Sequence, residues 1–201
     1  MLLGICGLIG SGKDTVAEHL VKHHGFKRDS FAKSLKDAVS SMFNWDRKML
    51  EGDTASSRHW REQPDAFWSE RFGKPITPRW VLQYFGTEVM RQGMYDAIWV
   101  DSVIGRYKGE NTVISDTRFI NEIKTIKAHG GKIMLVKKGE LPTREEMQKQ
   151  GTHQSEWDWI GSDFDYVIEN NGTKEELFDK VAELIIGDQI SNTPTQTLNS
   201  T

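Results

Sequence analysis

The stretch Gly7-Leu8-Ile9-Gly10-Ser11-Gly12-Lys13-Asp14-Thr15 decides the fold class. It lies between an apolar run at residues 2–6, typical of a strand buried on both faces, and residues 14–24, whose apolar side chains recur at helical spacing. A glycine-rich turn in this setting is typical of a phosphate loop, in which backbone N–H groups and the helix N-terminus surround a phosphate and Lys13 reaches the outer phosphates. The alternative is an ordinary glycine-rich strand-to-helix turn.

The residue after the lysine departs from the strict phosphate-loop pattern. Ser or Thr is usual there, whereas here Asp14 follows Lys13 and Thr15 comes one place later. We therefore expect a magnesium ion to be held with more water and fewer protein ligands than in switch GTPases. Asp14 could orient that water or favour the first helical turn through the helix dipole, and both interpretations remain open.

Strands and helices alternate along the rest of the chain. Strands are predicted at residues 26–31, 112–115, 132–136 and 166–168, and helices at 33–43, 77–91, 95–107, 119–129 and 173–186. This alternation predicts a three-layer α/β fold, with a central parallel sheet and helices on both faces. We expect one domain at residues 1–187 and a disordered, polar tail at 188–201.

The composition limits the partners and the compartment. The chain has 201 residues, 26 basic against 29 acidic side chains, one cysteine (Cys6) and no apolar run that approaches the length of a membrane span. A net charge of −3 gives no general attraction to nucleic acid or to anionic membranes. The sequence therefore predicts a cytoplasmic protein that works on small molecules, without nucleic-acid or membrane partners.

A second motif, Val113-Ile114-Ser115-Asp116-Thr117-Arg118, ends an apolar strand with a carboxylate. Open α/β sheets bind their ligands at the carboxyl ends of the strands, so Asp116 is a candidate for a position beside a metal ion. The alternative for Asp116 is an N-cap of the next helix. Arg118 could neutralise a phosphate, or it could form a surface ion pair.

Motifs along the chain occur in the same order as in phage deoxynucleoside monophosphate kinases, and the chain resembles that family over about residues 1–186, weakly between 44 and 75. They are the 11–15 loop, Phe31-Ala32 with Leu35-Lys36, Leu82-Gln83 with Gly86-Thr87, Trp99, Asp116-Thr117-Arg118 with Glu122, His153 with Glu156, and Asn170-Asn171-Gly172. The resemblance implies a P-loop kinase with a five-stranded parallel sheet, a monophosphate-binding lobe at about 44–78 and a lid at about 137–161.

The resemblance also implies the roles of individual residues. The ATP phosphates would be held by Gly10, Ser11, Gly12, Lys13, Asp14 and Thr15. The acceptor site would be lined by Arg58, Gly86, Thr87, Trp99, Asp116, Arg118 and Glu122, with Trp99 as a platform for the base. The lid would carry Arg144, His153 and Glu156. Lys13, Asp116 and Arg118 would be catalytic, and Thr15 and Asp116 would reach Mg²⁺ through water. The relatives suggest a homodimer.

We therefore expect transfer of the γ-phosphoryl group of ATP, with Mg²⁺, to the phosphate of a deoxynucleoside monophosphate. The alternatives are a P-loop kinase of another acceptor, of the dephospho-coenzyme A or phosphomevalonate type, and a non-catalytic nucleotide-binding module. Relatives can carry Lys-Arg where this chain has Ile9-Gly10, so other positive charges must compensate. The candidates are Arg58, Arg61, Arg79, Arg91 and Arg144.

Overall fold

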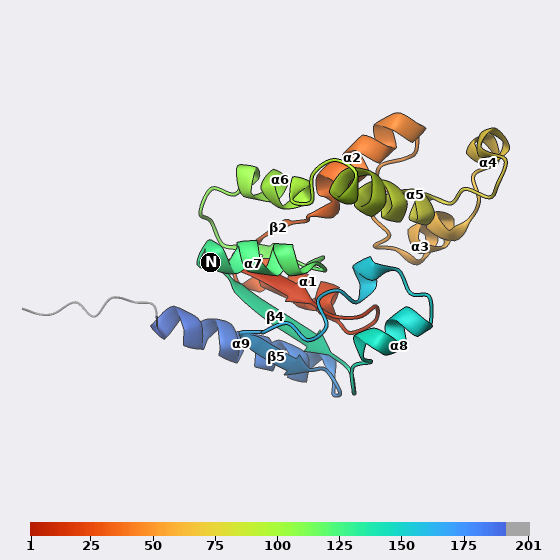
Figure 1. Cartoon of the computed structure of the whole chain (residues 1–201). Helices are drawn as coiled ribbons and strands as arrows, with labels where there is room; N and C mark the ends of the chain where they lie inside the picture. Colours follow the sequence, from red (N-terminus) through yellow and green to blue (C-terminus); the bar gives the residue numbers. More distant parts are fainter. Residues whose placement is uncertain (192–201) are drawn as a thin grey trace, which may run out of the picture.

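A parallel sheet of five strands lies at the centre of the computed structural model, which describes residues 1–191 (Figure 1). The strand order is β2-β3-β1-β4-β5, and every neighbouring pair is parallel. The strands are β1 (Leu2–Cys6), β2 (Lys27–Asp29), β3 (Thr112–Ile114), β4 (Lys132–Lys137) and β5 (Tyr166–Glu169). Since all five run the same way, their carboxyl ends meet at one edge.

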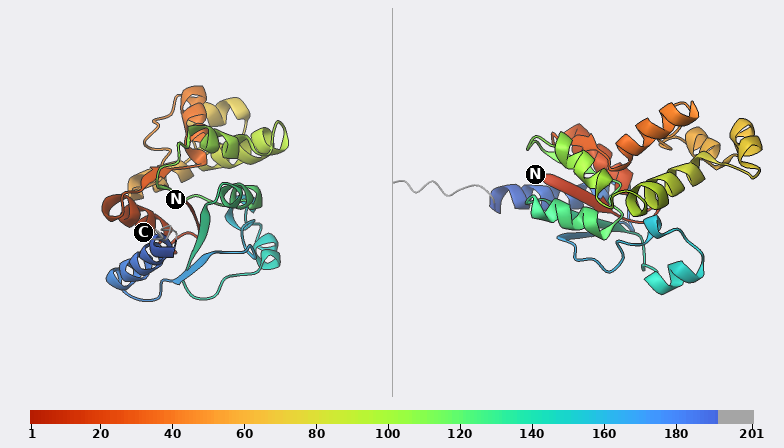
Figure 2. Two further views of the ribbon diagram at one scale, coloured as in Figure 1. Left: turned by 90° about the vertical axis from the view of Figure 1, so that its left-hand side faces the viewer. Right: turned by 45° about the horizontal axis from the view of Figure 1, so that its top comes forward.

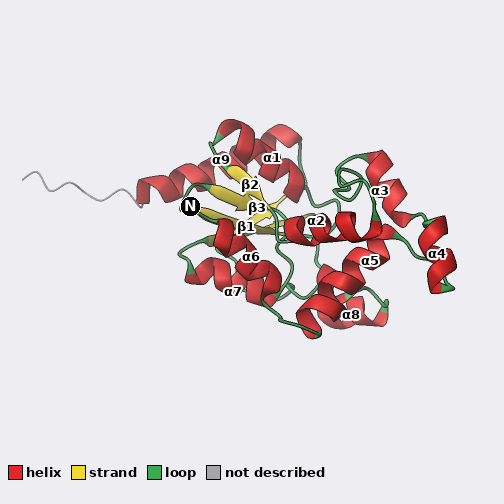
Figure 3. Ribbon diagram, turned by 90° about the horizontal axis from the view of Figure 1, so that it is seen from above, coloured by secondary structure: helices red, strands yellow, loops and turns green. Residues whose placement is uncertain are grey.

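Helices cover both faces of this sheet, as Figure 3 shows from above. The helices are α1 (Lys13–His23), α2 (Ala32–Phe43), α3 (Ala55–Glu62), α4 (Ala66–Phe72), α5 (Pro78–Tyr84), the π-helix η1 (Phe85–Gln92), α6 (Ile98–Arg106), α7 (Ile120–Ala128), α8 (Arg144–Lys149), the short η2 (Gln154–Glu156) and α9 (Lys174–Ser191).

The alternation of side chains along β1 divides the core into two layers. Leu3 and Ile5 pack with α1 and α9, whereas Leu2 and Cys6 pack in a second cluster with α2, α6 and α7. Both faces of β1 are therefore buried, which explains its unbroken apolar sequence. The three-layer α/β fold predicted from the sequence is confirmed.

Residues 44–78 stand out from the carboxyl end of the sheet and carry the short helices α3 and α4 (Figure 1). Tryptophan side chains attach them: the Trp45 Nε1 donates to Asp65 at 2.8 Å, and the Trp68 Nε1 donates to the Phe43 carbonyl oxygen at 3.0 Å. Asp65 also caps α4 through the Trp68 backbone N–H. The segment thus has short helices, and its tryptophans pin it to the end of α2.

Residues 137–161 lie at the same end of the molecule as α3 and α4 (Figure 2), and Met147, Trp159 and Ile160 pack in the same core cluster as Trp45. Helix α8 begins with a capping box between Thr143 and Glu146. Arg144 turns back onto its own segment and donates to the backbone carbonyl oxygens of Asp158 and Ile160. These bonds give the segment internal order without regular structure over most of its length.

Several element boundaries differ from the sequence prediction. The helix expected at residues 77–91 is α5 followed by η1, and α6 begins at Ile98, three residues later than expected. Helix α9 continues to Ser191, so residues 188–191 are helical and not part of a tail; Gly187 alone does not end it, and the next proline is Pro194. The remaining tail, 192–201, lies outside the described residues.

None of the helices among the described residues has the length and apolar character needed to cross a bilayer.

Candidate functional site

The phosphate loop connects β1 to α1 at the carboxyl edge of the sheet. Gly10 and Gly12 have φ angles of 82° and 101°, a left-handed conformation that favours glycine. Asn170, which follows β5, donates from Nδ2 to the Ser11 carbonyl oxygen at 2.9 Å, and a Cβ atom on Gly12 would lie 2.5 Å from that same nitrogen. The loop is therefore shaped by its own glycines and braced by a side chain from the far end of the chain.

Charged groups gather where this loop enters α1. The Lys13 Nζ lies 3.5 Å from the Asp14 carboxylate, and Thr15 is half-buried in the same helical turn. A residue not predicted from the sequence, Arg28 of β2, also contacts Asp14, at 2.7 Å, and donates to the Ser115 hydroxyl at 2.8 Å. Lys13 and Asp14 thus lie together as expected, with Arg28 as an additional cation.

Asp116 has a different position from the one expected. Its carboxylate accepts from the backbone N–H groups of Phe31 and Ala32, at 3.0 and 2.9 Å, and from the Ser30 hydroxyl at 2.7 Å. It therefore caps the start of α2, neither facing a metal ion with free oxygens nor capping the helix that follows it in sequence. The end of β3 places the carboxylate at the sheet edge, where it accepts hydrogen bonds from the start of α2.

Magnesium prefers oxygen ligands, and its usual coordination retains several water molecules. Of the two carboxylates considered for it, Asp14 is 57% exposed beside the loop, whereas the oxygens of Asp116 are already bonded. No group of three or more His, Cys, Asp or Glu residues within the described part of the chain is arranged to hold a metal ion. The residues present fit a magnesium ion held mostly by water and phosphate, with Asp14 and Thr15 nearby.

Arg118 joins the sheet edge to the 137–161 segment. Its Nη1 lies 2.5 Å from the Glu156 carboxylate, and this pairing and the other acidic groups nearby raise the pKa of the guanidinium despite burial. His153 contacts Glu88 of η1 through Nε2, at 3.1 Å. Two of the three residues predicted for the lid therefore contact the core, while Arg144 bonds within the segment.

Arg61 of α3 lies within electrostatic range of two other arginines, Arg79 of α5 and Arg118, and we call these three residues the arginine cluster. Burial lowers the pKa of the Arg61 guanidinium, and the positive charges of Arg79 and Arg118 lower it further. The Arg61 Nε is buried without a hydrogen-bond partner in the described structure. Arg61 also packs on Gly52, where a Cβ would lie 2.1 Å from the guanidinium carbon. Arg61 therefore combines a buried, like-charged environment with one unsatisfied donor, whereas Arg79 and Arg118 are paired with Glu62 and Glu156.

The other arginines proposed as compensating charges lie elsewhere. Arg58 is exposed on α3 and donates to the backbone oxygens of Gly52 and Asp53, so it does not join the arginine cluster. Arg91 is buried with its own acidic partners. Of the five candidates, Arg61 is therefore the one whose pKa responds to the charge of Arg118.

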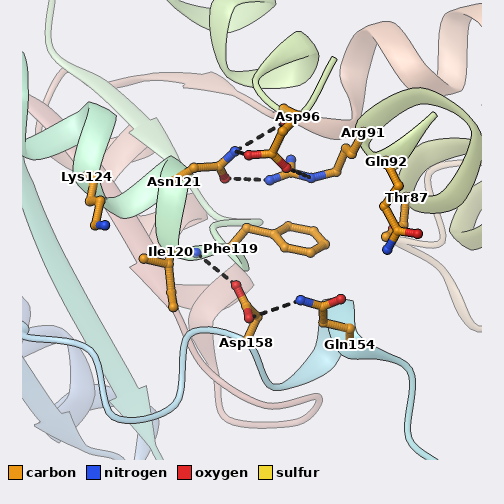
Figure 4. Close-up of a pocket in the computed structure, with 10 residues that line it drawn as sticks. All are labelled: Thr87, Arg91, Gln92, Asp96, Phe119, Ile120, Asn121, Lys124, Gln154 and Asp158. Carbon is orange, nitrogen blue, oxygen red and sulfur yellow. Dashed lines mark hydrogen bonds and ion pairs between the residues drawn. The ribbon is translucent and has the colours of Figure 1, made fainter. Parts of the chain in front are cut away.

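A cavity of about 330 Å³ opens between η1, the start of α7 and the 154–158 loop (Figure 4). The ring of Phe119 projects into it, and the Arg91 guanidinium stacks over that ring with its carbon 3.8 Å from the centroid. The lining is otherwise mostly polar: Thr87, Gln92, Asp96, Ile120, Asn121, Lys124, Gln154 and Asp158. Among the residues predicted for the acceptor site, Thr87 alone lines this cavity in the part of the chain that the structure describes.

Glu122 lies behind the cavity wall. Its carboxylate is 3.2 Å from the Arg91 Nη1 and accepts from the backbone N–H groups of Arg118 and Phe119, at 2.7 and 3.0 Å. Burial dominates over these favourable contacts and raises the pKa of Glu122 to about 7. Instead of lining the acceptor site as expected, Glu122 fixes the two residues that face it.

Trp99 is also behind the site. Its ring is 7% exposed within the core, and its Nε1 donates to the Gly86 carbonyl oxygen at 2.9 Å. Gly86 itself is needed for close packing, since a Cβ there would lie 2.8 Å from Leu35. The Trp99 ring is therefore not available to stack on a base, and it supports the π-helix that presents Thr87. Phe119, which is half-buried, is the aromatic ring that lines the cavity, and no sequence pattern singled it out.

Comparison with known proteins finds one family model and one curated relative that resemble this chain in sequence. A family model described as "Deoxynucleotide monophosphate kinase" matches residues 53–181. A protein of Acanthamoeba polyphaga mimivirus named "Putative deoxynucleotide monophosphate kinase" is 31% identical over 200 residues, covering 92% of this chain and 96% of that protein.

Solved structures are similar to this chain at low sequence identity. The Thermus thermophilus protein TT1252 is 16% identical with a TM-score of 0.50, covering 94% of this chain and 97% of that one. Shikimate kinase from Aquifex aeolicus is 12% identical with a TM-score of 0.48, covering 94% and 99%.

The phosphate loop on a parallel sheet and the two sequence similarities agree with one another. They identify a P-loop kinase, and ATP is the co-substrate of such an enzyme. The model match spans more than half of the chain, and the viral relative is matched over almost its whole length. The chain belongs to the deoxynucleotide monophosphate kinase family.

Proposed function

We propose that this kinase transfers the γ-phosphoryl group of ATP to the phosphate of a deoxynucleoside monophosphate, giving a deoxynucleoside diphosphate and ADP. The observation that carries the proposal is the arginine cluster. Arg79 and Arg118 have carboxylate partners, Glu62 and Glu156, whereas Arg61 has no ion-pair partner in the described structure, so an anion bound beside it would compensate its buried charge. A phosphate acceptor supplies that anion, whereas an uncharged hydroxyl acceptor does not.

The cavity supports a nucleotide as the acceptor. Arg118 and Phe119 are consecutive, and we assign the acceptor phosphate to Arg118 and the base to the Phe119 ring of the same site. Aromatic faces of this kind stack on nucleobases, and the polar side chains around the ring offer donors and acceptors to a base edge or sugar. We therefore assign the cavity to the nucleoside part of the acceptor.

Catalysis needs little covalent chemistry from the protein, because the attacking group is already a phosphate oxygen. Alignment of two phosphates and positive charge around the transferred group supply most of the rate. Lys13 would neutralise the outer ATP phosphates, and Arg118 would neutralise charge shared between donor and acceptor. Magnesium, when bound, supplies further charge neutralisation, and Asp14 and Thr15 are the residues nearest to hold its water.

In this proposal, the acceptor phosphate replaces the carboxylate partners that the arginine cluster has in the structure. Arg118 pairs with Glu156 of the 137–161 segment, and Arg79 pairs with Glu62. An acceptor phosphate competes with both carboxylates, and it brings residues of the 44–78 segment toward the sheet edge. We propose on this basis that 44–78 is the monophosphate lobe and 137–161 the lid, which together exclude water during transfer.

An acceptor panel tests the proposal. ADP release is measured with each of the four common deoxynucleoside monophosphates, with dephospho-coenzyme A, with phosphomevalonate and with no acceptor. We expect at least one deoxynucleoside monophosphate to raise the rate well above that without acceptor. Stimulation by one of the other two compounds alone, or ATP hydrolysis that no acceptor changes, would contradict the proposal.

A further inference from the structure

We propose that Arg28 is a second cationic ligand of the ATP triphosphate, beside Lys13, and that it supplies part of the nucleotide affinity independently of magnesium. The proposal concerns the donor site of the kinase and does not depend on the identity of the acceptor.

The position of Arg28 is set by three elements of the sheet edge. It comes from β2, and one nitrogen, Nη2, bonds both to Asp14 at 2.7 Å and to the Ser115 hydroxyl at 2.8 Å. Asp14 is the residue after the loop lysine, and Ser115 is the residue after β3. Many P-loop enzymes hold magnesium between these two places, so the guanidinium lies where the outer phosphates of ATP come closest.

The guanidinium retains donors for a phosphate. An arginine side chain has five N–H groups in a planar fork that matches phosphate oxygens, and only Nη2 of Arg28 has a protein acceptor in the described structure. The side chain is 41% exposed, so these donors are accessible. Arg28 can therefore keep its contact with Ser115 while it binds an anion.

The surrounding charges favour an anion at this place. Lys13 and Arg28 share the single carboxylate of Asp14, which leaves one positive charge in excess at the entrance of α1. The loop itself has Ile9-Gly10 between its first glycine and Ser11, so it contributes no other basic side chain. A simple surface ion pair would need neither the second cation nor the Ser115 contact.

The test is the affinity for ATP in EDTA and in excess magnesium, measured by calorimetry without any acceptor. We expect Arg28→Ala to weaken ATP binding about tenfold in EDTA and by less in magnesium, because the metal then neutralises the same phosphates. Arg28→Lys is expected to keep most of the affinity. Lys27→Ala is the matched control, since Lys27 is the preceding residue of β2 and pairs with Glu110 and not with Asp14. It is expected to leave the affinity for ATP unchanged.

A second variant separates binding from structural support. Asp14→Asn is expected to tighten ATP binding in EDTA, because it removes a negative charge beside the phosphates. If the Arg28–Asp14 ion pair only held α1 against β2, Arg28→Ala and Asp14→Asn would both weaken ATP binding. Each would then do so to the same extent in EDTA and in magnesium. That pattern would overturn the proposal, and so would a higher affinity of Arg28→Ala than of the wild type for magnesium–ATP. A wild-type protein that binds no ATP at all would instead reject the donor site itself.

Discussion

Glu122 shows how a single buried carboxyl group positions a site without touching the substrate. It accepts from the backbone N–H groups of Arg118 and Phe119 and faces the buried Arg91. Arg118 belongs to the arginine cluster, and Phe119 lines the cavity. The direction of both side chains depends on this one anchor at the start of α7.

The raised pKa of Glu122 predicts a pH dependence of stability. Between pH 4.5 and about 7 the folded protein keeps a proton that the unfolded chain has lost, so the free energy of unfolding falls as the pH rises through this range. The loss approaches about 3 kcal/mol, from 1.36 kcal/mol per unit of pKa.

Urea unfolding of the wild type and Glu122→Gln at pH 5 and pH 8 checks this. Glutamine cannot ionise, so the decline should be much smaller in the variant. The lowered pKa of His19 gives an opposite slope in both proteins and cancels in the comparison. Equal slopes in the two proteins would show that Glu122 is ionised throughout.

The sequence predicts site residues well where they are local. Lys13 and its loop form a contiguous motif, and both lie where they were expected. Arg28 contacts Ser115 across 87 residues, and Asn170 contacts Ser11 across 159, so no local pattern reveals them. Asp116 was ambiguous for another reason: a carboxylate at a strand end serves equally as a ligand or a cap until its neighbour, here α2, is known.

At the scale of one element, the cap of α2 has a measurable consequence. Asp116→Ala removes the acceptor for two backbone N–H groups and the Ser30 hydroxyl, and it should lower the free energy of unfolding by about 1–2 kcal/mol. The magnesium concentration that gives half-maximal activity should remain close to that of the wild type.

That magnesium titration decides between two roles for Asp116. A group that caps a helix changes stability without changing the metal requirement. A large increase in the magnesium requirement, with an unchanged free energy of unfolding, would show that Asp116 acts at the magnesium site instead.

Strands β1, β3 and β4 and the long helices follow from hydrophobic periodicity, because each buries one continuous apolar stripe or run. The π-helix does not. Its position depends on Gly86, whose carbonyl oxygen accepts from the Trp99 Nε1 and whose lack of a Cβ leaves room for Leu35. Both are contacts between separate elements. Such widened turns are common at functional sites, and here one presents Thr87 to the cavity.

At the scale of the whole molecule, the proposed function depends on contact between the 44–78 segment and the sheet edge. The net charge of −3 conceals a local concentration of positive charge, since Arg61, Arg79 and Arg118 come from sequence positions far apart. Composition therefore excludes a generally basic surface but says nothing about such a site.

Arg61→Ala tests this meeting point. Loss of one charged donor should raise the KM for the acceptor by about tenfold or more, with the affinity for ATP unchanged. The melting temperature without ligand should not fall, because the change also removes repulsion with Arg79 and Arg118.

Arg71→Ala is the matched control, since Arg71 stacks on Phe67 in the same segment and is not part of the arginine cluster. It should leave the KM for the acceptor as in the wild type. The cluster would lose its assigned role if the two variants behaved alike, or if Arg61→Ala weakened ATP instead.

The most direct measurement follows the phosphoryl group itself. The protein is incubated with ATP labelled in the γ-phosphate, magnesium and each deoxynucleoside monophosphate, and the products are separated. We predict that label enters a deoxynucleoside diphosphate with the wild type, and that Lys13→Ala abolishes this transfer while it remains folded. Label found only in inorganic phosphate, or undiminished transfer by Lys13→Ala, would contradict the account.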